Sequence, residues 1–149
     1  MCIRDSIKGF AIFLNIAKFN QNFFDENFFL YFEEIDLCKR IRKNDIKIYI
    51  DPSIKVNHLG GTSHNSELNK TMELSRNWHW MWSSFYYHKK HYGYFNALLK
   101  MSPKLISSLI KFIFYLLIFQ KFKSDIYKHR VFGIINSVLL KKSWYRPRI

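Results

Sequence analysis

Cysteines and acidic residues are scarce in this chain of 149 residues. The two cysteines, Cys2 and Cys38, form no C-x-x-C pair, which excludes a disulfide framework and a zinc ribbon. Only 11 Asp and Glu stand against 24 Lys and Arg, and the formal net charge is +13. This excess favours an anionic partner such as phosphate, an anionic membrane or nucleic acid, with a Lys-rich proteome as the alternative explanation.

Internal repeats and low-complexity linkers are also missing. The first 16 residues are not typical of a signal peptide, because residues 1–8 are polar and the apolar run at 9–16 is short. A reducing cytoplasm is therefore expected. Aromatic residues, by contrast, make up 19% of the chain and hydrophobic residues 48%. This composition excludes a disordered protein and allows one domain with a hydrophobic core.

The most informative stretch is residues 23–43, FFDENFFLYFEEIDLCKRIRK. Apolar residues three and four apart predict a helix from about Glu33 onward, with acids in its first turn and basic residues in its last turns. Asn44 is expected to end it in a left-handed conformation. By itself this pattern is also that of an ordinary, well-charged helix.

Within this stretch, FDENFFLYFEEIDLCKR resembles the acidic motif of family-two glycosyltransferases, especially the rhamnosyltransferase-like branch. The second acid of the family's block is the catalytic base. The resemblance implies that Glu34 is the base, with Glu33 beside it and Asp36 in support. Two departures are that the family base is most often Asp and that Gly usually stands where this chain has Asn22.

A second matching segment is KVNHLGGTSHN, in which the resemblance implies that His58 helps to bind a divalent metal, Mg or Mn. The alternative is a glycine turn with a hydrogen-bonded histidine. His64 is a weaker candidate, and a zinc site from Cys38 and these two histidines has no recognisable spacing. The tail GIINSVLLKKSWYRPRI also resembles this branch, so the resemblance covers about residues 9–149.

The apolar run at residues 9–16, GFAIFLNI, is predicted to form a buried strand, although its periodicity also permits a helix. In the family the matching segment lies beside the donor sugar, which implies that Gly9 and Phe10 bind substrate. The alternation of Ile46, Ile48 and Ile50 predicts a second, half-buried strand.

A long helix is predicted from about Ser66 to His91, ending at Gly93. Its aromatic residues, from Trp78 to Tyr87, point around the helix, which fits either burial on several sides or contact with a membrane interface. Arg76 and Trp78 are candidate substrate-binding residues. The Arg76 guanidinium matches phosphate geometry, and its alternative is a solvated helix charge.

The last part of the chain combines an apolar helix with basic residues. Ser102 and Pro103 predict a helix start, and residues 105–119 are apolar except for a narrow polar stripe that includes Lys111. A spanning helix needs about 20 apolar residues, so an amphipathic helix lying in the membrane plane is the better interpretation. The basic residues that follow favour an anionic membrane surface.

Together these patterns predict an α/β fold, with residues 66–149 as a helical, basic, membrane-associating tail. The resemblance implies that residues 1–65 are the C-terminal part of a GT-A glycosyltransferase domain. The resemblance implies inverting sugar transfer from a nucleotide-sugar donor to a lipid-linked or glycan acceptor. We expect a peripheral position on the inner face of the cell membrane and no nucleic-acid partner.

The family's nucleotide-binding half and its D-x-D motif are not found in this sequence. We therefore expect a truncated chain without activity of its own. The alternative is a non-catalytic basic module that binds anionic membrane or nucleic acid.

Overall fold

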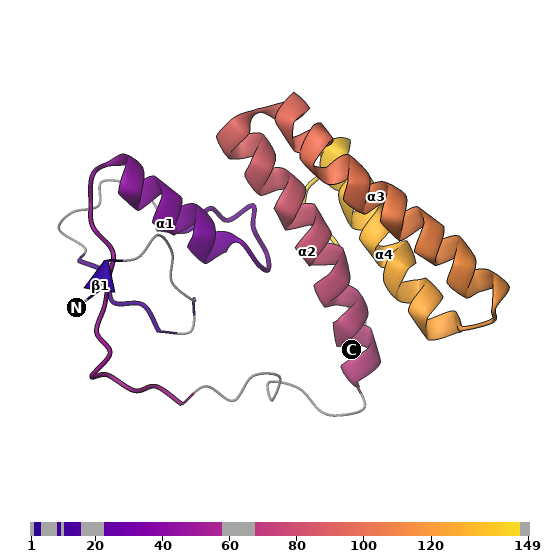
Figure 1. The fold of residues 1–149 in the computed structure, drawn as a ribbon, viewed down its shortest axis with the longest axis horizontal. Helices are drawn as coiled ribbons and strands as arrows, with labels where there is room; N and C mark the ends of the chain where they lie inside the picture. The colour runs from indigo at the N-terminus through magenta and orange to yellow at the C-terminus, as the bar shows by residue number, and fades with distance from the viewer. Residues whose placement is uncertain (1, 4–8, 10, 16–22, 58–67, 147–149) are drawn as a thin grey trace. The chain divides into compact units, whose positions relative to one another are not determined.

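The computed structural model describes residues 2–3, 9, 11–15, 23–57 and 68–146 (Figure 1). The chain divides into two compact units, one of Met1–Phe28 with Phe32–Ser63 and one of Phe29–Tyr31 with His64–Ile149. The sequence predicted a division after residue 65. The elements, in chain order, are β1 (Cys2–Ile3), α1 (Glu33–Lys43), β2 (Tyr49–Ile50), α2 (Asn69–Tyr92), α3 (Tyr94–Leu117) and α4 (Lys121–Val138).

The α/β prediction, and with it the GT-A domain part, is wrong for the residues that the structure describes, because these are mostly helical. Strand pairing among them is limited to β1 and β2, two residues each, antiparallel with Cys2 opposite Ile50. The described part of the 9–16 run forms no strand, and the Phe13 side chain is 91% exposed. An apolar run becomes a buried strand only where neighbouring strands accept its hydrogen bonds, and β1 and β2 provide no such sheet.

Helix α1 confirms the helix predicted from the acidic stretch. Its apolar stripe, Leu37, Cys38 and Ile41, is buried and packs with Ile48 in a small core. Acids occupy the first turn and basic residues the last turn, so both ends complement the helix dipole. The predicted left-handed stop at Asn44 lies one residue too early. Asp45 adopts the positive φ, 56°, and donates its backbone N–H to the Arg42 carbonyl.

The second unit packs α2, α3 and α4 against one another (Figure 1). Gly93 alone separates α2 from α3 and has φ 90°, a conformation that side chains other than glycine rarely adopt. Its N–H donates to the Lys89 carbonyl and its carbonyl accepts from the Ala97 N–H. Gly93 therefore caps the end of α2 and the start of α3. The hydrophobic core between the helices consists of Met81, Phe85, Ala97, Met101 and Ile134.

Small residues let α2 and α4 approach closely. A Cβ added at Gly133 would lie 2.3 Å from the backbone oxygen of Trp78, a distance that real Cβ atoms do not show. Ser83, Ser124 and Ser137 are buried as well. Gly133 therefore sets the spacing of these helices, because a larger residue would push backbone against backbone.

The helix start predicted at Ser102 and Pro103 is wrong, because α3 begins at Tyr94 and continues through both residues. Pro103 lacks the N–H that would bond to the carbonyl of Leu99, four residues earlier. The Ser102 hydroxyl donates to that same carbonyl at 3.1 Å. This substitute bond explains how the helix continues through the proline.

The aromatic residues of α2 lie mainly in the core. Trp78, Trp82 and Phe85 are at most 3% exposed, whereas Trp80 is 42% exposed. The Trp82 indole donates to the Lys141 carbonyl at 3.0 Å, which satisfies its polar group at the edge of the core. Burial on several sides is thus the outcome for this helix. Within the described residues, no helix has the length and apolarity to cross a membrane.

Candidate functional site

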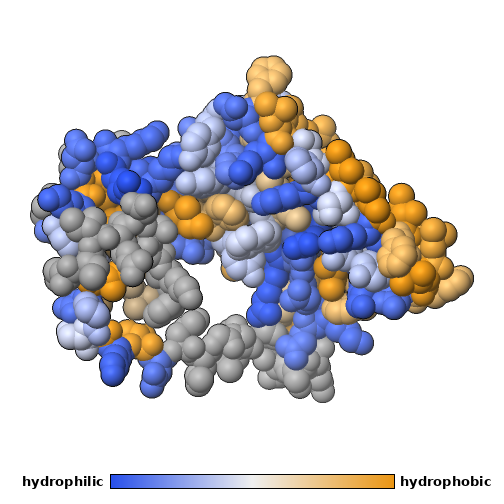
Figure 2. Space-filling view, viewed as in Figure 1, coloured by the Kyte–Doolittle hydropathy of each residue, from blue (hydrophilic) through white to orange (hydrophobic). Residues whose placement is uncertain are grey.

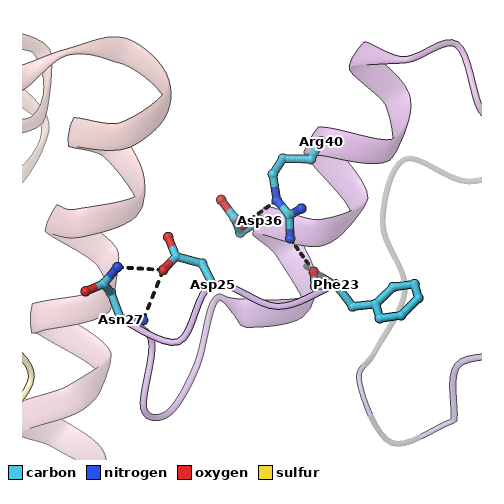
Figure 3. Close-up of polar contacts among 5 residues, drawn as sticks. All are labelled: Phe23, Asp25, Asn27, Asp36 and Arg40. Carbon is cyan, nitrogen blue, oxygen red and sulfur yellow. Dashed lines mark hydrogen bonds and ion pairs between the residues drawn. The ribbon is translucent and has the colours of Figure 1, made fainter. Parts of the chain in front are cut away.

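The segment before α1 is shaped by an aspartate turn. Asp25 Oδ1 accepts hydrogen bonds from the Asn27 backbone N–H at 3.0 Å and from the Asn27 side-chain amide at 2.7 Å (Figure 3). The Phe28 N–H bonds to the Asp25 carbonyl, which closes the turn. A D-x-N sequence commonly forms such a turn, because the carboxylate mimics a backbone acceptor. The FDEN part of the motif therefore forms a local turn.

The aromatic residues that follow pack within the helical unit. The Leu30 carbonyl accepts the Ser83 hydroxyl at 2.8 Å, and the Tyr31 ring meets Trp80 edge to face. Phe29 carries the Arg146 guanidinium over its ring, 3.4 Å from the ring centre. Phe29 and Tyr31 therefore have packing contacts within the helical unit.

Helix α1 begins with unusual backbone geometry. Tyr31 and Phe32 have φ of 66° and 71°, and such positive values are outliers for bulky residues. The Phe32 carbonyl still accepts the first helical bond, from the Asp36 N–H at 2.8 Å. Strain of this kind costs about 1–3 kcal/mol per residue and gathers at functional sites. No side chain caps this helix start. Glu33 and Glu34 lie in the first turn, at the electropositive end of the helix dipole.

The two glutamates are both half-buried. Oε2 of Glu33 is buried and makes no hydrogen bond to the described residues. Burial raises the pKa of Glu33, a hydrogen bond from its own backbone opposes this, and the like charge of Glu34 raises it further. A carboxyl group with a raised pKa and an unpaired oxygen is a candidate for proton transfer.

Asp36 has a different role. It is fully buried, and its Oδ2 accepts from Nε of Arg40 at 2.8 Å (Figure 3). The same guanidinium donates to the Phe23 carbonyl, so the ion pair fastens the start of the motif to α1. Asp36 therefore holds the Arg40 side chain, and its predicted support of a catalytic base stays a prediction. The i, i+4 spacing of this pair was the sequence signal that would have identified Arg40.

The structure brings one further predicted residue to this pair. Gly9 lies against Glu34, since a Cβ added at Gly9 would be 3.5 Å from the Glu34 Cβ. Leu14, from the same run, packs against the core of α1. Phe10 and His58 lie outside the described residues. Gly9 is thus placed next to the predicted base.

The two candidate residues on α2 belong to the helical unit. Arg76 is half-buried. Trp78 is 1% exposed and stacks on Tyr145, with ring centres 5.7 Å apart. Burial of this degree gives Trp78 a packing role in the structure.

His79 forms a polar centre that the sequence did not indicate. Its Nε2 is 2.8 Å from the Tyr145 carbonyl and therefore carries the proton, and its Nδ1 accepts from the Ser143 hydroxyl at 3.0 Å. Burial, followed by a smaller contribution from Arg146, lowers the pKa of His79 to about 4 against the opposing effect of the Tyr145 bond. The neutral ring fastens the C-terminal segment to α2. No local pattern reveals a contact across more than sixty residues.

The implied divalent metal finds no ligand set in the part of the chain that the structure describes. No group of three or more His, Cys, Asp and Glu side chains there could hold a metal ion. Asp36 is paired with Arg40, and a Mg²⁺ ion held by one or two carboxylates takes its remaining ligands from water and substrate phosphates.

Comparison with known proteins adds no relative: no family model, curated protein or solved structure matches this chain.

Proposed function

We propose that this chain carries the acceptor-activating part of an inverting glycosyltransferase of family two. The enzyme would transfer a sugar from a nucleotide-sugar donor to a lipid-linked glycan acceptor at the inner face of the cell membrane. The observation that supports this most is the pair of half-buried carboxylates at the strained start of α1. The resemblance of FDENFFLYFEEIDLCKR to the family motif assigns the chemistry.

In this reaction Glu34 accepts the proton of the acceptor hydroxyl as its oxygen bonds to the anomeric carbon. The bond from that carbon to the donor diphosphate breaks, and attack from the opposite side inverts the configuration. A general base must be ionised before the reaction. Glu34 lies in the first turn of α1, at the electropositive end of the helix, and Gly9 lies against its side chain. Glu33 provides a second acceptor oxygen, and Asp36 with Arg40 holds the helix start in place.

The donor and its divalent metal, Mg or Mn, require groups that the described residues do not provide. The sequence has no D-x-D motif, so we propose that a nucleotide-binding segment with D-x-D supplies the main ligands and that His58 adds one. The chain alone would then be inactive, because an unpositioned donor gives the base nothing to act on. The bound metal would neutralise the leaving diphosphate.

The test joins the full chain to the nucleotide-binding segment of a family-two transferase. Transfer is measured with a panel of nucleotide sugars and a polyprenyl-linked glycan, and the anomeric configuration of the product is read by NMR. We expect transfer with inversion in the joined protein and none by the chain alone. Glu26→Gln is the matched control, because Glu26 is an exposed acid of the preceding turn. A folded, donor-binding protein that is inactive with every donor would refute the proposal.

The alternative function is a non-catalytic module for anionic membrane or nucleic acid. Stacking on bases requires exposed aromatic rings. Trp78, Trp82 and Phe85 are buried, whereas Trp80 and Trp144 are 42% and 59% exposed. The membrane version has more support, because exposed apolar residues and lysines share the surface of α3. Filter binding to nucleic acid with a salt titration separates the two, since a steep salt dependence would favour nucleic acid.

A further inference from the structure

One face of α3 is apolar and uncovered within the described structure. Its six residues are between 53% and 80% exposed and follow one another at intervals of four, seven, four, three and four positions: Phe95, Leu99, Ile106, Ile110, Ile113 and Leu117. These intervals place them on a single side of the helix. At a rise of 1.5 Å per residue the stripe is ~33 Å long. Figure 2 shows hydrophobic residues along the edge that α3 occupies in Figure 1.

The stripe continues into the turn after α3. Phe119 is 92% exposed there and has a positive φ, 55°, while Lys121 and Lys123 follow directly. A shallow surface hollow of about 430 Å³ lies on the same helix, with Pro103, Ile106 and Ile110 in its wall and Lys111 at one end. An apolar surface of this extent is unusual for an uncovered face and marks an interaction site.

A row of lysines follows a different side of α3, roughly a third of a turn from the centre of the stripe at 3.6 residues per turn. Lys100, Lys104 and Lys111 are four and seven positions apart, so they lie together along one flank of α3. Asp125 is the single acid between residues 94 and 146. Loss of hydration lowers the pKa of Lys104, and the like charges of Lys100 and Arg130 lower it further. The three lysines therefore form a positively charged flank with no nearby run of acidic residues to neutralise it.

We propose that this face of α3 binds the surface of an anionic lipid bilayer, with the helix lying in the membrane plane. The apolar stripe would enter the boundary between headgroups and acyl chains, and the lysine row would meet the anionic headgroups. A second copy would offer this part of the chain almost no carboxylate, since Asp125 is the single acid between residues 94 and 146, whereas anionic headgroups complement its positive charge. The inference rests on the proposed function, whose lipid-linked acceptor would be met at this surface.

The test is co-sedimentation of the full chain with vesicles of phosphatidylcholine alone and of phosphatidylcholine with phosphatidylglycerol, at low and high salt. The stripe variant is Leu99→Gln, Ile110→Gln and Leu117→Gln, because glutamine preserves helix propensity. Its matched control replaces three exposed apolar residues of the other unit: Phe24→Gln, Ile54→Gln and Val56→Gln. The charge variant is Lys100→Gln with Lys111→Gln, and its control is Lys47→Gln with Lys55→Gln.

We expect binding to the anionic vesicles that falls with salt. The stripe variant should bind at least roughly tenfold more weakly, and the charge variant about fivefold more weakly for each lysine, while both controls bind as the wild type does. Circular dichroism verifies that each variant keeps its helices. Equal binding to both kinds of vesicle, or unchanged binding by the stripe variant, would overturn the proposal. The proposal would also be overturned if the wild-type chain did not bind vesicles but formed a dimer that the stripe variant abolished.

Vesicle binding requires no turnover. Loss of sugar transfer with intact vesicle binding would therefore count against the proposed function alone, and the reverse result against the membrane surface alone.

Discussion

Replacing His79 with glutamine should change how the stability of the helical unit depends on pH. The His79 ring is fully buried, donates from Nε2 to the Tyr145 carbonyl and accepts from Ser143. Its pKa falls from 6.5 to about 4, with burial as the main cause. Between these values the unfolded chain takes up a proton that the folded chain does not. Stability from this group is complete above pH 6.5 and is lost as the pH falls toward about 4.

The size of this loss follows from the depression of the pKa, and is on the order of 3 kcal/mol. Glutamine can donate to Tyr145 and accept from Ser143 but cannot titrate. It also loses the ring contacts with Phe29 and Trp78, so we expect His79→Gln to be less stable by about 1–2 kcal/mol at neutral pH. That deficit should disappear or reverse as the pH approaches the folded pKa, while the wild type loses stability.

The assay is guanidinium unfolding followed by tryptophan fluorescence across this pH range. All four tryptophans belong to the helical unit, so the signal reports on it alone. The difference between the two proteins removes the shared titration of other groups. Parallel stability curves for the wild type and His79→Gln would refute a buried, neutral His79.

Three further changes test the packing and the charges. Gly133→Ala should destabilise the helical unit by about 1–3 kcal/mol in the same fluorescence assay, since its Cβ would meet the Trp78 carbonyl, whereas the exposed Lys128→Ala should not. Asp36→Ala leaves Arg40 without its carboxylate and should cost about 3 kcal/mol, measured as faster amide hydrogen exchange across α1; unchanged exchange would contradict the ion pair's role. Because burial raises the pKa of Glu33, ionisation costs stability as the pH rises above 4.5. Glu33→Gln should therefore melt higher than the wild type near neutral pH and lose this advantage below pH 4.5; a lower melting temperature would contradict the direction of the shift.

The sequence was sufficient for elements that local chemistry specifies. α1 was predictable because apolar spacing, acids and basic residues all agree within eleven residues. The end of α2 was predictable because Gly93 takes a backbone conformation that other residues avoid. The D-x-N turn and the Asp36–Arg40 pair depend on short spacings, so both could have been predicted, although neither was among the predictions from the sequence.

Other features depend on distant contacts and gave no local signal. The position of Pro103 predicted a helix start, but a Ser102 hydrogen bond and the packing of Met101 sustain the helix through it. The strand predicted at residues 9–16 required a sheet that the described residues do not form. His79 and its partners lie far apart in the sequence, and the positive φ of Tyr31 and Phe32 opposes the usual preference of aromatic residues.

The most direct test of the proposed function is the turnover of Glu34→Gln. The full chain, joined to a nucleotide-binding segment with D-x-D, is assayed for sugar transfer with saturating donor and acceptor, beside Glu33→Gln and Glu26→Gln. We predict that Glu34→Gln lowers kcat by about a hundred- to ten-thousand-fold while donor binding and helix content stay unchanged. Turnover near that of the wild type in Glu34→Gln would contradict its role as the base, and loss of turnover in Glu33→Gln alone would assign that role to Glu33.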